Sequence, residues 1–191
     1  MILVIDNYDS FVHNLARYIR EEGAETRIVR NDAASAEELL RMKPRGVVLS
    51  PGPKAPKDAG VSLALLEKLP ASMPVLGVCL GHQCLVEAFG GATLRAKAPL
   101  HGEASVIRHD GAALFAGLPS PMPAGRYHSL ISAPAGEELS PCAWSEEGEL
   151  MAVRRKSAPW HGVQFHPESL LTPHGRAMIR NFVAMTREEA L

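Results

Sequence analysis

Continuous apolar runs alternate with segments of helical periodicity through the first half of the chain. We expect buried strands at four of these runs: Ile2–Ile5, Thr26–Val29, Gly46–Leu49 and Pro74–Leu76. Runs that are apolar throughout are typical of strands covered on both faces. Because a helical pattern separates each strand from the next, the sequence predicts a parallel sheet with right-handed crossovers and helices on both sides.

The segments between the strands carry signals for helix starts and stops, which satisfy backbone groups that a helix end leaves unpaired. The first expected helix is capped by Asp9 or Ser10, has Phe11 and Ile19 on its apolar face and ends at Gly23. The second begins with the capping box Ser35 and Glu38 and runs through Met42. Two more are expected from about Ala59 to Leu69, and from the residue after Cys79 to about Phe89.

After Gly91 the pattern changes to short β-like pieces between turns rich in proline and glycine. Ala104–Ile107 and Leu150–Val153 are two such pieces, and Gly162–Ser169 is typical of a strand that runs into a site. A final helix is expected to start at Thr172 and Pro173 and to run through about Met185, with Met178, Ile179, Phe182 and Val183 on its inner side and a frayed tail from Arg187 to Leu191.

These patterns together predict an α/β protein. Its central sheet is expected to be mostly parallel and flanked by helices, with a small antiparallel β region in the second half of the chain. At 191 residues the chain is long enough for a sizeable core, and we expect one domain over residues 1–191.

Composition excludes some classes of partner and favours one compartment. The net charge of −1, without a strong basic run, gives no electrostatic reason to expect nucleic acid or a membrane surface as partner. The apolar start of the chain turns polar at Asp6, too early for a signal peptide or a membrane span. Three unevenly spaced cysteines do not form a disulfide framework and suit a reducing environment, so we expect a cytoplasmic protein.

The segment Gly77–Gln83 is the strongest candidate for chemistry. A buried strand that ends at Gly-x-Cys-x-Gly and leads into a helix has the pattern of a nucleophile elbow, with Cys79 as the nucleophile. Two glycines remove the Cβ atoms that would collide in so tight a turn, and the helix N-terminus favours a thiolate. One alternative is that Cys79 is an inert core residue. Another is that Cys79, His82 and Cys84 bind a metal ion. Their side chains are expected to diverge, and the sequence has no second pair of ligands at zinc spacing, so we expect no metal.

A cysteine nucleophile needs a base, and the base needs a group that orients it. His166 is the best-placed histidine, because Glu168 lies two residues on, and an extended backbone would put both side chains on one face. An oxyanion hole is expected from the backbone N–H of Leu80 and from a loop amide of Gly52. Gly52 lies in the loop Ser50–Pro53, where it is free to take unusual dihedrals between two prolines, although a plain turn is equally compatible with that loop.

Taken together, three motifs resemble the class I (triad) glutamine amidotransferases over essentially the whole chain. They are Ser50-Pro51-Gly52-Pro53, Gly77-Val78-Cys79-Leu80-Gly81-His82-Gln83 and Gly162-Val163-Gln164-Phe165-His166-Pro167-Glu168. Within that family, Asp6–Phe11 and Arg126–Leu130 look like the glutaminase component of anthranilate synthase or of aminodeoxychorismate synthase. The resemblance implies a flavodoxin-like α/β fold and no cofactor.

The resemblance also implies a mechanism and a partner. Cys79 would attack the side-chain amide of L-glutamine, release ammonia and leave a thioester that water hydrolyses, with His166 as acid and base and Glu168 orienting it. The residues implied in substrate binding are Pro51, Gly52, Gln83, Ser129 and Leu130, and Gly52 and Leu80 would supply the oxyanion amides. Ammonia would pass to a chorismate-binding synthase subunit in a heteromeric complex, for the anthranilate route or, alternatively, the aminodeoxychorismate route or both.

Two other kinds of protein share part of these features. A cysteine hydrolase or peptidase would share the elbow, but Gln83 and the pair Ser129-Leu130 argue against it. A docking subunit without turnover would have no reason to keep Cys79 together with His166 and Glu168. Lys54 and Glu103 depart from the family pattern, which has cysteine and lysine there, and the reversed charge at Glu103 weakens any assignment of partner contacts nearby.

Overall fold

One nine-stranded sheet organises the part of the chain that the computed structural model describes, residues 1–187 apart from the side chain of Lys97. The strand order is β2-β1-β3-β4-β9-β8-β7-β5-β6. The parallel strands are β1 (Ile2–Asp6), β2 (Thr26–Arg30), β3 (Gly46–Leu49), β4 (Val75–Val78) and β9 (Trp160–Val163). The antiparallel strands are β5 (Ala92–His109), β6 (Met122–Ala133), β7 (Leu139–Ser145) and β8 (Leu150–Arg155).

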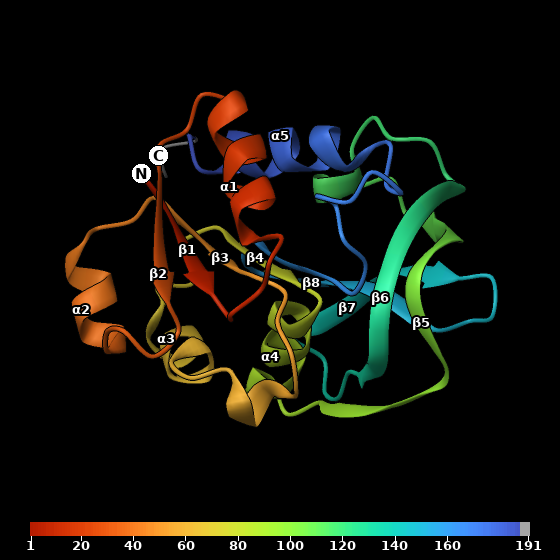
Figure 1. Ribbon diagram of the computed structural model, residues 1–191, viewed down its shortest axis with the longest axis horizontal. Helices are drawn as coiled ribbons and strands as arrows, with labels where there is room; N and C mark the ends of the chain where they lie inside the picture. Colours follow the sequence, from red (N-terminus) through yellow and green to blue (C-terminus); the bar gives the residue numbers. More distant parts are fainter. Residues whose placement is uncertain (188–191) are drawn as a thin grey trace.

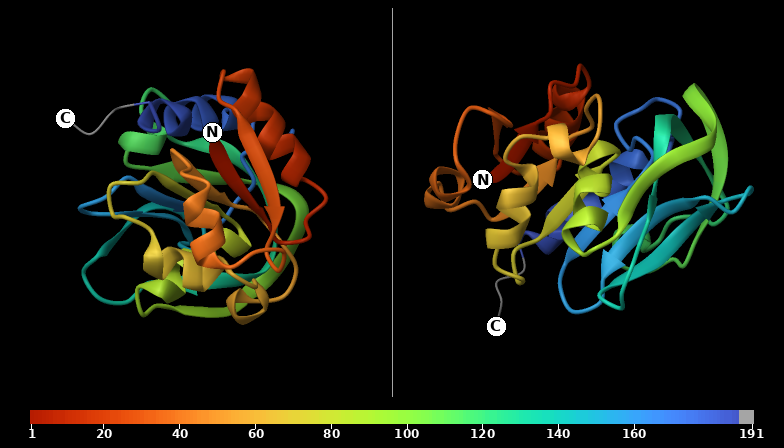
Figure 2. Two further views of the ribbon diagram at one scale, coloured as in Figure 1. Left: turned by 90° about the vertical axis from the view of Figure 1, so that its left-hand side faces the viewer. Right: turned by 90° about the horizontal axis from the view of Figure 1, so that it is seen from below.

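The predicted α/β fold, with a central sheet flanked by helices, is therefore confirmed, but the sheet is mixed and not mostly parallel, because antiparallel pairings among the described strands are as many as parallel ones. The antiparallel strands are longer than expected, and they extend the parallel sheet through the pairing of β8 with β9. Figure 1 and the right-hand view of Figure 2 both place α2 and β2 at one end of the molecule and β5 and β6 at the other.

Helices cover both faces of the parallel strands (Figure 1). Helices α1 (Val12–Glu21) and α5 (Gly175–Met185) lie on one face, and α2 (Ala36–Arg41), α3 (Ser62–Lys68) and α4 (Leu80–Ala88) lie on the other. The alternation of side chains along a strand explains this arrangement, since Ile2 and Val4 join the core under α1 and α5 while Leu3 and Ile5 join the other core. Short 3-10 turns occur at Pro56–Asp58 and Ala113–Phe115.

The first helix begins later than expected. Neither Asp9 nor Ser10 is its N-cap, because α1 starts at Val12 with Phe11 at the cap position. The Asp9 carboxylate accepts instead from the backbone N–H of Phe11, at 2.8 Å, and so closes the turn before the helix. The helical pattern predicts Phe11 in the core, but its side chain is 38% exposed and lies outside the core. Gly23, with φ of +82°, ends the segment as predicted.

Two other helices also start later than predicted. Helix α3 begins at Ser62, because the 3-10 turn Pro56–Asp58 takes up the preceding residues. Helix α5 begins at Gly175 and not at Pro173. The residues expected on the inner side of α5 are confirmed as buried: Met178, Ile179, Phe182 and Val183. The frayed tail expected beyond Arg187 lies outside the described residues. Within residues 1–187, the helices are too short or too polar to cross a membrane.

The capping box of α2 is confirmed and offers a test of local stability. The Ser35 hydroxyl accepts from the Glu38 N–H at 3.3 Å, and the Glu38 carboxylate accepts from the Ser35 N–H at 2.8 Å. Ser35→Ala removes one acceptor and is expected to lower the free energy of unfolding by about 1 kcal/mol in urea denaturation. Ser35→Thr keeps the acceptor and serves as the control, and equal stability of the alanine variant and the parent would contradict the prediction.

Candidate active site

Cys79 lies at a strained turn between β4 and α4. Its φ of +51° is uncommon for a residue with a side chain. A Cβ atom built on Gly77 would lie 2.4 Å from the Gly81 carbonyl oxygen, and one built on Gly81 would lie 2.3 Å from the Leu49 carbonyl oxygen. The predicted reason for the two glycines is therefore confirmed, since the turn closes only where both Cβ atoms are missing.

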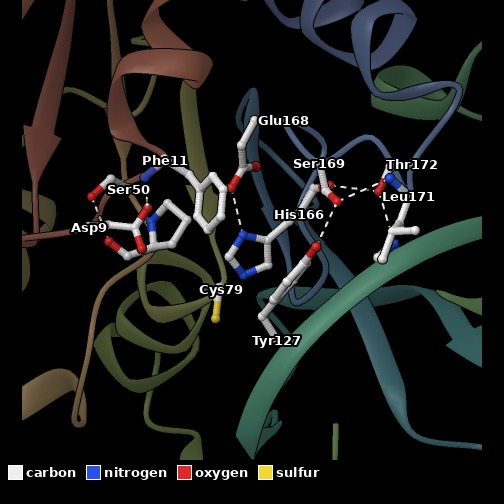
Figure 3. A network of polar contacts seen from close by, with 12 residues as sticks. Asp9, Phe11, Ser50, Cys79, Tyr127, His166, Glu168, Ser169, Leu171 and Thr172 are labelled. Carbon is white, nitrogen blue, oxygen red and sulfur yellow. Dashed lines mark hydrogen bonds and ion pairs between the residues drawn. The ribbon is translucent and has the colours of Figure 1, made fainter. Parts of the chain in front are cut away.

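His166 and Glu168 form a buried pair next to Cys79. Nδ1 of His166 lies 2.6 Å from Oε1 of Glu168, and both residues are 3% exposed. Figure 3 shows the Cys79 sulfur on the side of the imidazole that carries Nε2, opposite the carboxylate. Nε2 is buried, and Cys79 is the group that acts on the ring from that side. The three side chains thus have the order sulfur, imidazole, carboxylate that a cysteine nucleophile with an oriented base requires.

The reason given for that pairing from the sequence was wrong. Strand β9 ends at Val163, and the chain turns at His166, where the Ser169 N–H donates to the His166 carbonyl at 3.2 Å. His166 and Glu168 therefore meet across a turn, and they do not share one face of an extended strand. The turn is held close to α5, because a Cβ atom on Gly175 would lie 1.8 Å from the Pro167 carbonyl oxygen.

The protonation of His166 is set by opposing effects. Burial lowers its pKa, while Cys79 and Glu168 raise it, and the net result is a pKa well above the usual value. An imidazole that gains a proton easily beside a sulfur favours transfer of the thiol proton to the ring. Asp9 is a further carboxyl group near this pair. Its pKa is raised, first by burial, and the charges of His166 and Glu168 act on it in opposite directions.

Thr172, predicted as a helix cap, supports His166 instead. Its hydroxyl donates to the His166 carbonyl at 2.6 Å and accepts from the Gly125 N–H at 2.9 Å (Figure 3). The Gly125 carbonyl in turn accepts from the His166 N–H at 3.0 Å. The ring of Tyr127 packs edge-on against the imidazole, with ring centroids 4.9 Å apart. Strand β6 and the loop after β9 are thereby joined around the candidate base.

Asn7 holds the loop Ser50–Pro53 in place. The backbone N–H of Asn7 donates to the Ser50 hydroxyl, and its side-chain amide donates to the Ser50 carbonyl, each at 2.9 Å. The Asn31 side chain donates to the side-chain oxygen of Asn7 at 2.9 Å. A Cβ atom on Gly52 would lie 2.5 Å from the Asn7 Cβ and 2.9 Å from a Leu80 methyl carbon. Gly52 is therefore needed for space, and not for the unusual dihedrals expected of it. The residue with a positive φ is Lys54, directly after the loop, with φ of +68°.

A cavity of about 160 Å³ opens in front of Cys79. The residues that line it are Gly52, Pro53, Lys54, Cys79, Gln83, His101, Tyr127, His128, Ser129 and Leu130. Of the predicted site residues, Gly52, Cys79, Gln83, Ser129 and Leu130 therefore share one cavity. Pro51 and Leu80 are not part of this lining, and His166 and Glu168 lie behind the sulfur.

Some residues that the structure brings next to Cys79 and His166 were not among the predicted site residues. Gln164 donates to the Cys79 sulfur at 3.6 Å and accepts from Gln83 at 3.2 Å, and Gln83 also donates to the Leu130 carbonyl at 3.3 Å. Gln164 stands two residues before His166, so its place inside the motif was the available signal. Tyr127 lies in the segment Arg126–Leu130 that carried the resemblance, but that segment gave no reason to place its ring against His166, which is distant in sequence.

The other cysteines and His82 do not form a metal site. Burial raises the pKa of the Cys84 and Cys142 thiols to about 12 and lowers the pKa of His82 to about 3. Among residues 1–187, no three histidine, cysteine, aspartate or glutamate side chains converge in a way that could hold a metal ion. The described cysteines are all buried and free of disulfide bonds.

The chain is similar to known proteins over nearly its whole length. The family pattern described as Glutamine amidotransferase class-I matches residues 3–186. Aminodeoxychorismate/anthranilate synthase component 2 of Bacillus subtilis (strain 168) is 46% identical over 195 residues, covering 100% of both chains. Anthranilate synthase component 2 of Pseudomonas aeruginosa is 47% identical over 192 residues, covering 96% of this chain and 94% of that one.

A solved structure shows the same fold. The crystal structure of a Thermoplasma acidophilum protein, described as part of a GMP synthase, superposes with a TM-score of 0.87 at 29% identity, covering 97% of this chain and 92% of that one. The family pattern spans nearly the whole chain, and the two relatives exceed 45% identity over nearly their full length. The chain therefore belongs to the class-I glutamine amidotransferase family and is a glutamine amidotransferase.

Proposed function

We propose that this chain is the glutaminase subunit of anthranilate synthase, and that it hydrolyses L-glutamine through a thioester at Cys79. The observation that carries the proposal is the buried pair His166–Glu168, with a 2.6 Å contact, behind a sulfur that faces a cavity. The thiol proton passes to Nε2 of His166, and the sulfur attacks the side-chain amide carbon of glutamine. The imidazolium then gives its proton to the leaving nitrogen, so that ammonia departs and a glutamyl thioester remains.

Water completes the cycle. His166 takes a proton from a water molecule as that water attacks the thioester carbon, and it returns the proton to the sulfur as glutamate leaves. Both attacks place negative charge on the former amide oxygen, and the N–H groups of Gly52 and Leu80 stabilise that charge. The contact of Gly52 with Leu80 supports this assignment, because it brings the loop and the N-terminus of α4 to one place.

Glutamine binding is assigned to the cavity lining around Cys79, from α4 and β6. Gln83, Ser129 and Leu130 hold the substrate, and Pro51 shapes the loop that carries Gly52. The hydrogen bond from Gln83 to the Leu130 carbonyl, at 3.3 Å, supports a preformed wall. We assign the whole of residues 1–191 to one amidotransferase domain, in line with the family match over residues 3–186.

The ammonia is proposed to pass to a chorismate-binding synthase subunit. Relatives named component 2 of anthranilate synthase, and of aminodeoxychorismate/anthranilate synthase, support a two-component complex. The dual name of the Bacillus subtilis relative keeps aminodeoxychorismate synthase, or a subunit shared by both enzymes, as the alternative. A cytoplasmic location fits the three free cysteines, which a reducing compartment preserves.

Replacing the nucleophile tests the mechanism. Cys79→Ser is expected to lower glutamine-dependent turnover at least about a thousandfold, because serine is a far weaker nucleophile beside this base. Turnover by the synthase complex supplied with free ammonia is expected to stay unchanged. Cys142→Ala, on β7, is the matched control and keeps glutamine turnover. A serine variant with full glutamine-dependent activity would mean that the chain only docks to its partner.

Alkylation distinguishes glutamine from other substrates. Iodoacetamide is expected to modify Cys79 selectively, because the pKa values of Cys84 and Cys142 are near 12. Glutamine is expected to slow this modification several-fold, measured by mass spectrometry of the alkylated peptide, and peptides or esters are expected to have no effect. Protection by an ester alone would indicate a hydrolase of another class.

The proposed oxyanion loop can be tested at Gly52. The methyl group of Gly52→Ala would lie 2.6 Å from the Asn7 carbonyl oxygen, so the loop must move. Loss of one oxyanion donor is expected to lower kcat for glutamine about a hundredfold, with KM changed much less. Ammonia-dependent synthesis in the complex is the control for folding. An unchanged kcat would remove Gly52 from the proposed hole.

A mixing experiment tests the partner and the pathway. The chain is combined with each candidate chorismate-binding subunit, chorismate and glutamine, and the aminated product is identified by mass spectrometry. Anthranilate with one partner supports the main proposal, and aminodeoxychorismate with the other supports the alternative. Ammonia-dependent product without any glutamine-dependent product would contradict the partner assignment.

A further inference from the structure

A second histidine, His128, lines the cavity in front of Cys79, and the proposed mechanism does not use it. It is 4% exposed and lies on β6, two residues after Arg126, which is 1% exposed. Alternate residues of a strand point to the same side, so both side chains enter the interior together. His128 thus lines the cavity, and Arg126 lies beside it in the interior.

The contact between the two side chains fixes the protonation state of His128. Nε of Arg126 lies 3.0 Å from Nε2 of His128. The arginine nitrogen carries a hydrogen atom and cannot accept, so Nε2 must be the acceptor and must lack a proton. The proton of the neutral ring is therefore on Nδ1. This nitrogen lies near the Leu130 backbone, but no described residue meets the geometry of a hydrogen bond with it.

Acidic side chains hold the guanidinium in place. Arg126 contacts the carboxylates of Glu149, which pairs with it closely, and of Glu147, at 3.8 Å, and it also donates to the Ser105 hydroxyl at 3.3 Å. These contacts leave the guanidinium little freedom to turn away from His128. A buried charge with this many partners keeps its orientation, because every alternative leaves a carboxylate or a donor unpaired.

We propose that Arg126 is a positioning residue that keeps His128 a neutral imidazole with its proton on Nδ1, so that His166 is the imidazole beside Cys79 that takes up a proton. The proposal rests on the proposed glutaminase function for its catalytic meaning, although the tautomer itself does not. A charged His128 would oppose the imidazolium that His166 forms when it accepts the thiol proton. It would also alter the wall near Leu130, which the proposed function assigns to glutamine.

Several titratable or charged groups act on His128 from the elements packed around it. They are Arg126 on the same strand, His101 on β5, His82 on α4 and His166 after β9, with Glu147 and Glu149 beyond the guanidinium. Burial lowers the pKa of His128 first, and the Arg126 charge lowers it further, to about 4. The neighbouring histidines act in the same direction when charged, and the Leu130 backbone opposes them.

The tautomer can be observed directly in the full chain. Nitrogen-15 NMR of histidine-labelled protein is expected to show His128 with a protonated Nδ1 and an unprotonated Nε2, unchanged from pH 8 down to pH 5. This measurement needs neither glutamine nor a partner, so it holds or fails independently of the proposed function. A protonated Nε2, or a His128 that becomes charged near pH 6.5, would overturn the proposal.

Variants test the role of Arg126. Arg126→Gln is expected to raise the pKa of His128 from about 4 part of the way toward the ordinary value of about 6.5, because burial remains, and to cause an additional loss of glutamine kcat/KM of about twofold to fourfold at pH 5.5 relative to pH 8. Arg108→Gln, an exposed residue of β5, removes the same charge and is expected to leave both quantities unchanged. A loss equal at every pH would mean that Arg126 acts only on structure.

A second substitution isolates the histidine. His128→Asn offers a donor in place of Nδ1–H but cannot titrate, so Arg126→Gln in the His128→Asn background is expected to add no pH-dependent loss. If Arg126→Gln alone fails to fold because Glu149 is left unpaired, Arg126→Gln with Glu149→Gln removes the unpaired carboxylate and allows the same measurement. A pH-dependent loss that persists without His128 would contradict the proposal.

Discussion

Close contact of backbone with backbone is the constraint on which the site depends. The carbonyl of Gly81 lies where a side chain of Gly77 would be, and the carbonyl of Leu49 lies where a side chain of Gly81 would be. Strands β3 and β4 and helix α4 can approach this far only because those positions carry no Cβ atom. The approach forces Cys79 into a left-handed conformation and directs its sulfur toward His166. The missing Cβ atom of Gly175 likewise allows the Pro167 carbonyl to approach α5 closely, which holds the turn that carries the imidazole in place.

The cavity lies where the parallel half and the antiparallel half of the sheet meet. The parallel half supplies Cys79, the loop at Gly52 and the turn at His166, all beyond the carboxyl ends of strands. The antiparallel half supplies the opposite wall through β6. Hydrogen bonds from Gln83 to Leu130, from Gly125 to Thr172 and from His166 to Gly125 tie the halves together. The geometry of the site therefore depends on the junction of β8 with β9, which joins the halves into one sheet.

Much of this could be predicted from the sequence, for identifiable physical reasons. The strands of the parallel half were evident because they are buried on both faces, and the elbow was evident because glycine spacing reports a steric need directly. The starts of α1, α3 and α5 were misplaced because Asp9, Pro56 and Thr172 have capping chemistry that serves neighbouring turns. The pairing of His166 with Glu168 was expected, but its geometry was not. Two residues separated by one can meet either on one face of a strand or across a turn, so the spacing around Pro167 did not distinguish the two. Tyr127, Gln164 and Asn7 were missed because their contacts come from residues distant in sequence.

The position of β6 in the sheet has a consequence for the behaviour of the protein at high concentration. Among the described strands it is the outermost at its end of the sheet, and other elements cover its outer backbone groups only in part, at Gly125 through His166 and Thr172 and at Leu130 through Gln83. Such an edge can template the addition of a strand from another molecule, and proline or an inward-pointing charge on the strand discourages this. Strand β6 has both, in Pro123 and the buried Arg126. The strand that forms one wall of the cavity therefore carries two features that discourage aggregation along the part of its edge that the loop after β9 leaves uncovered.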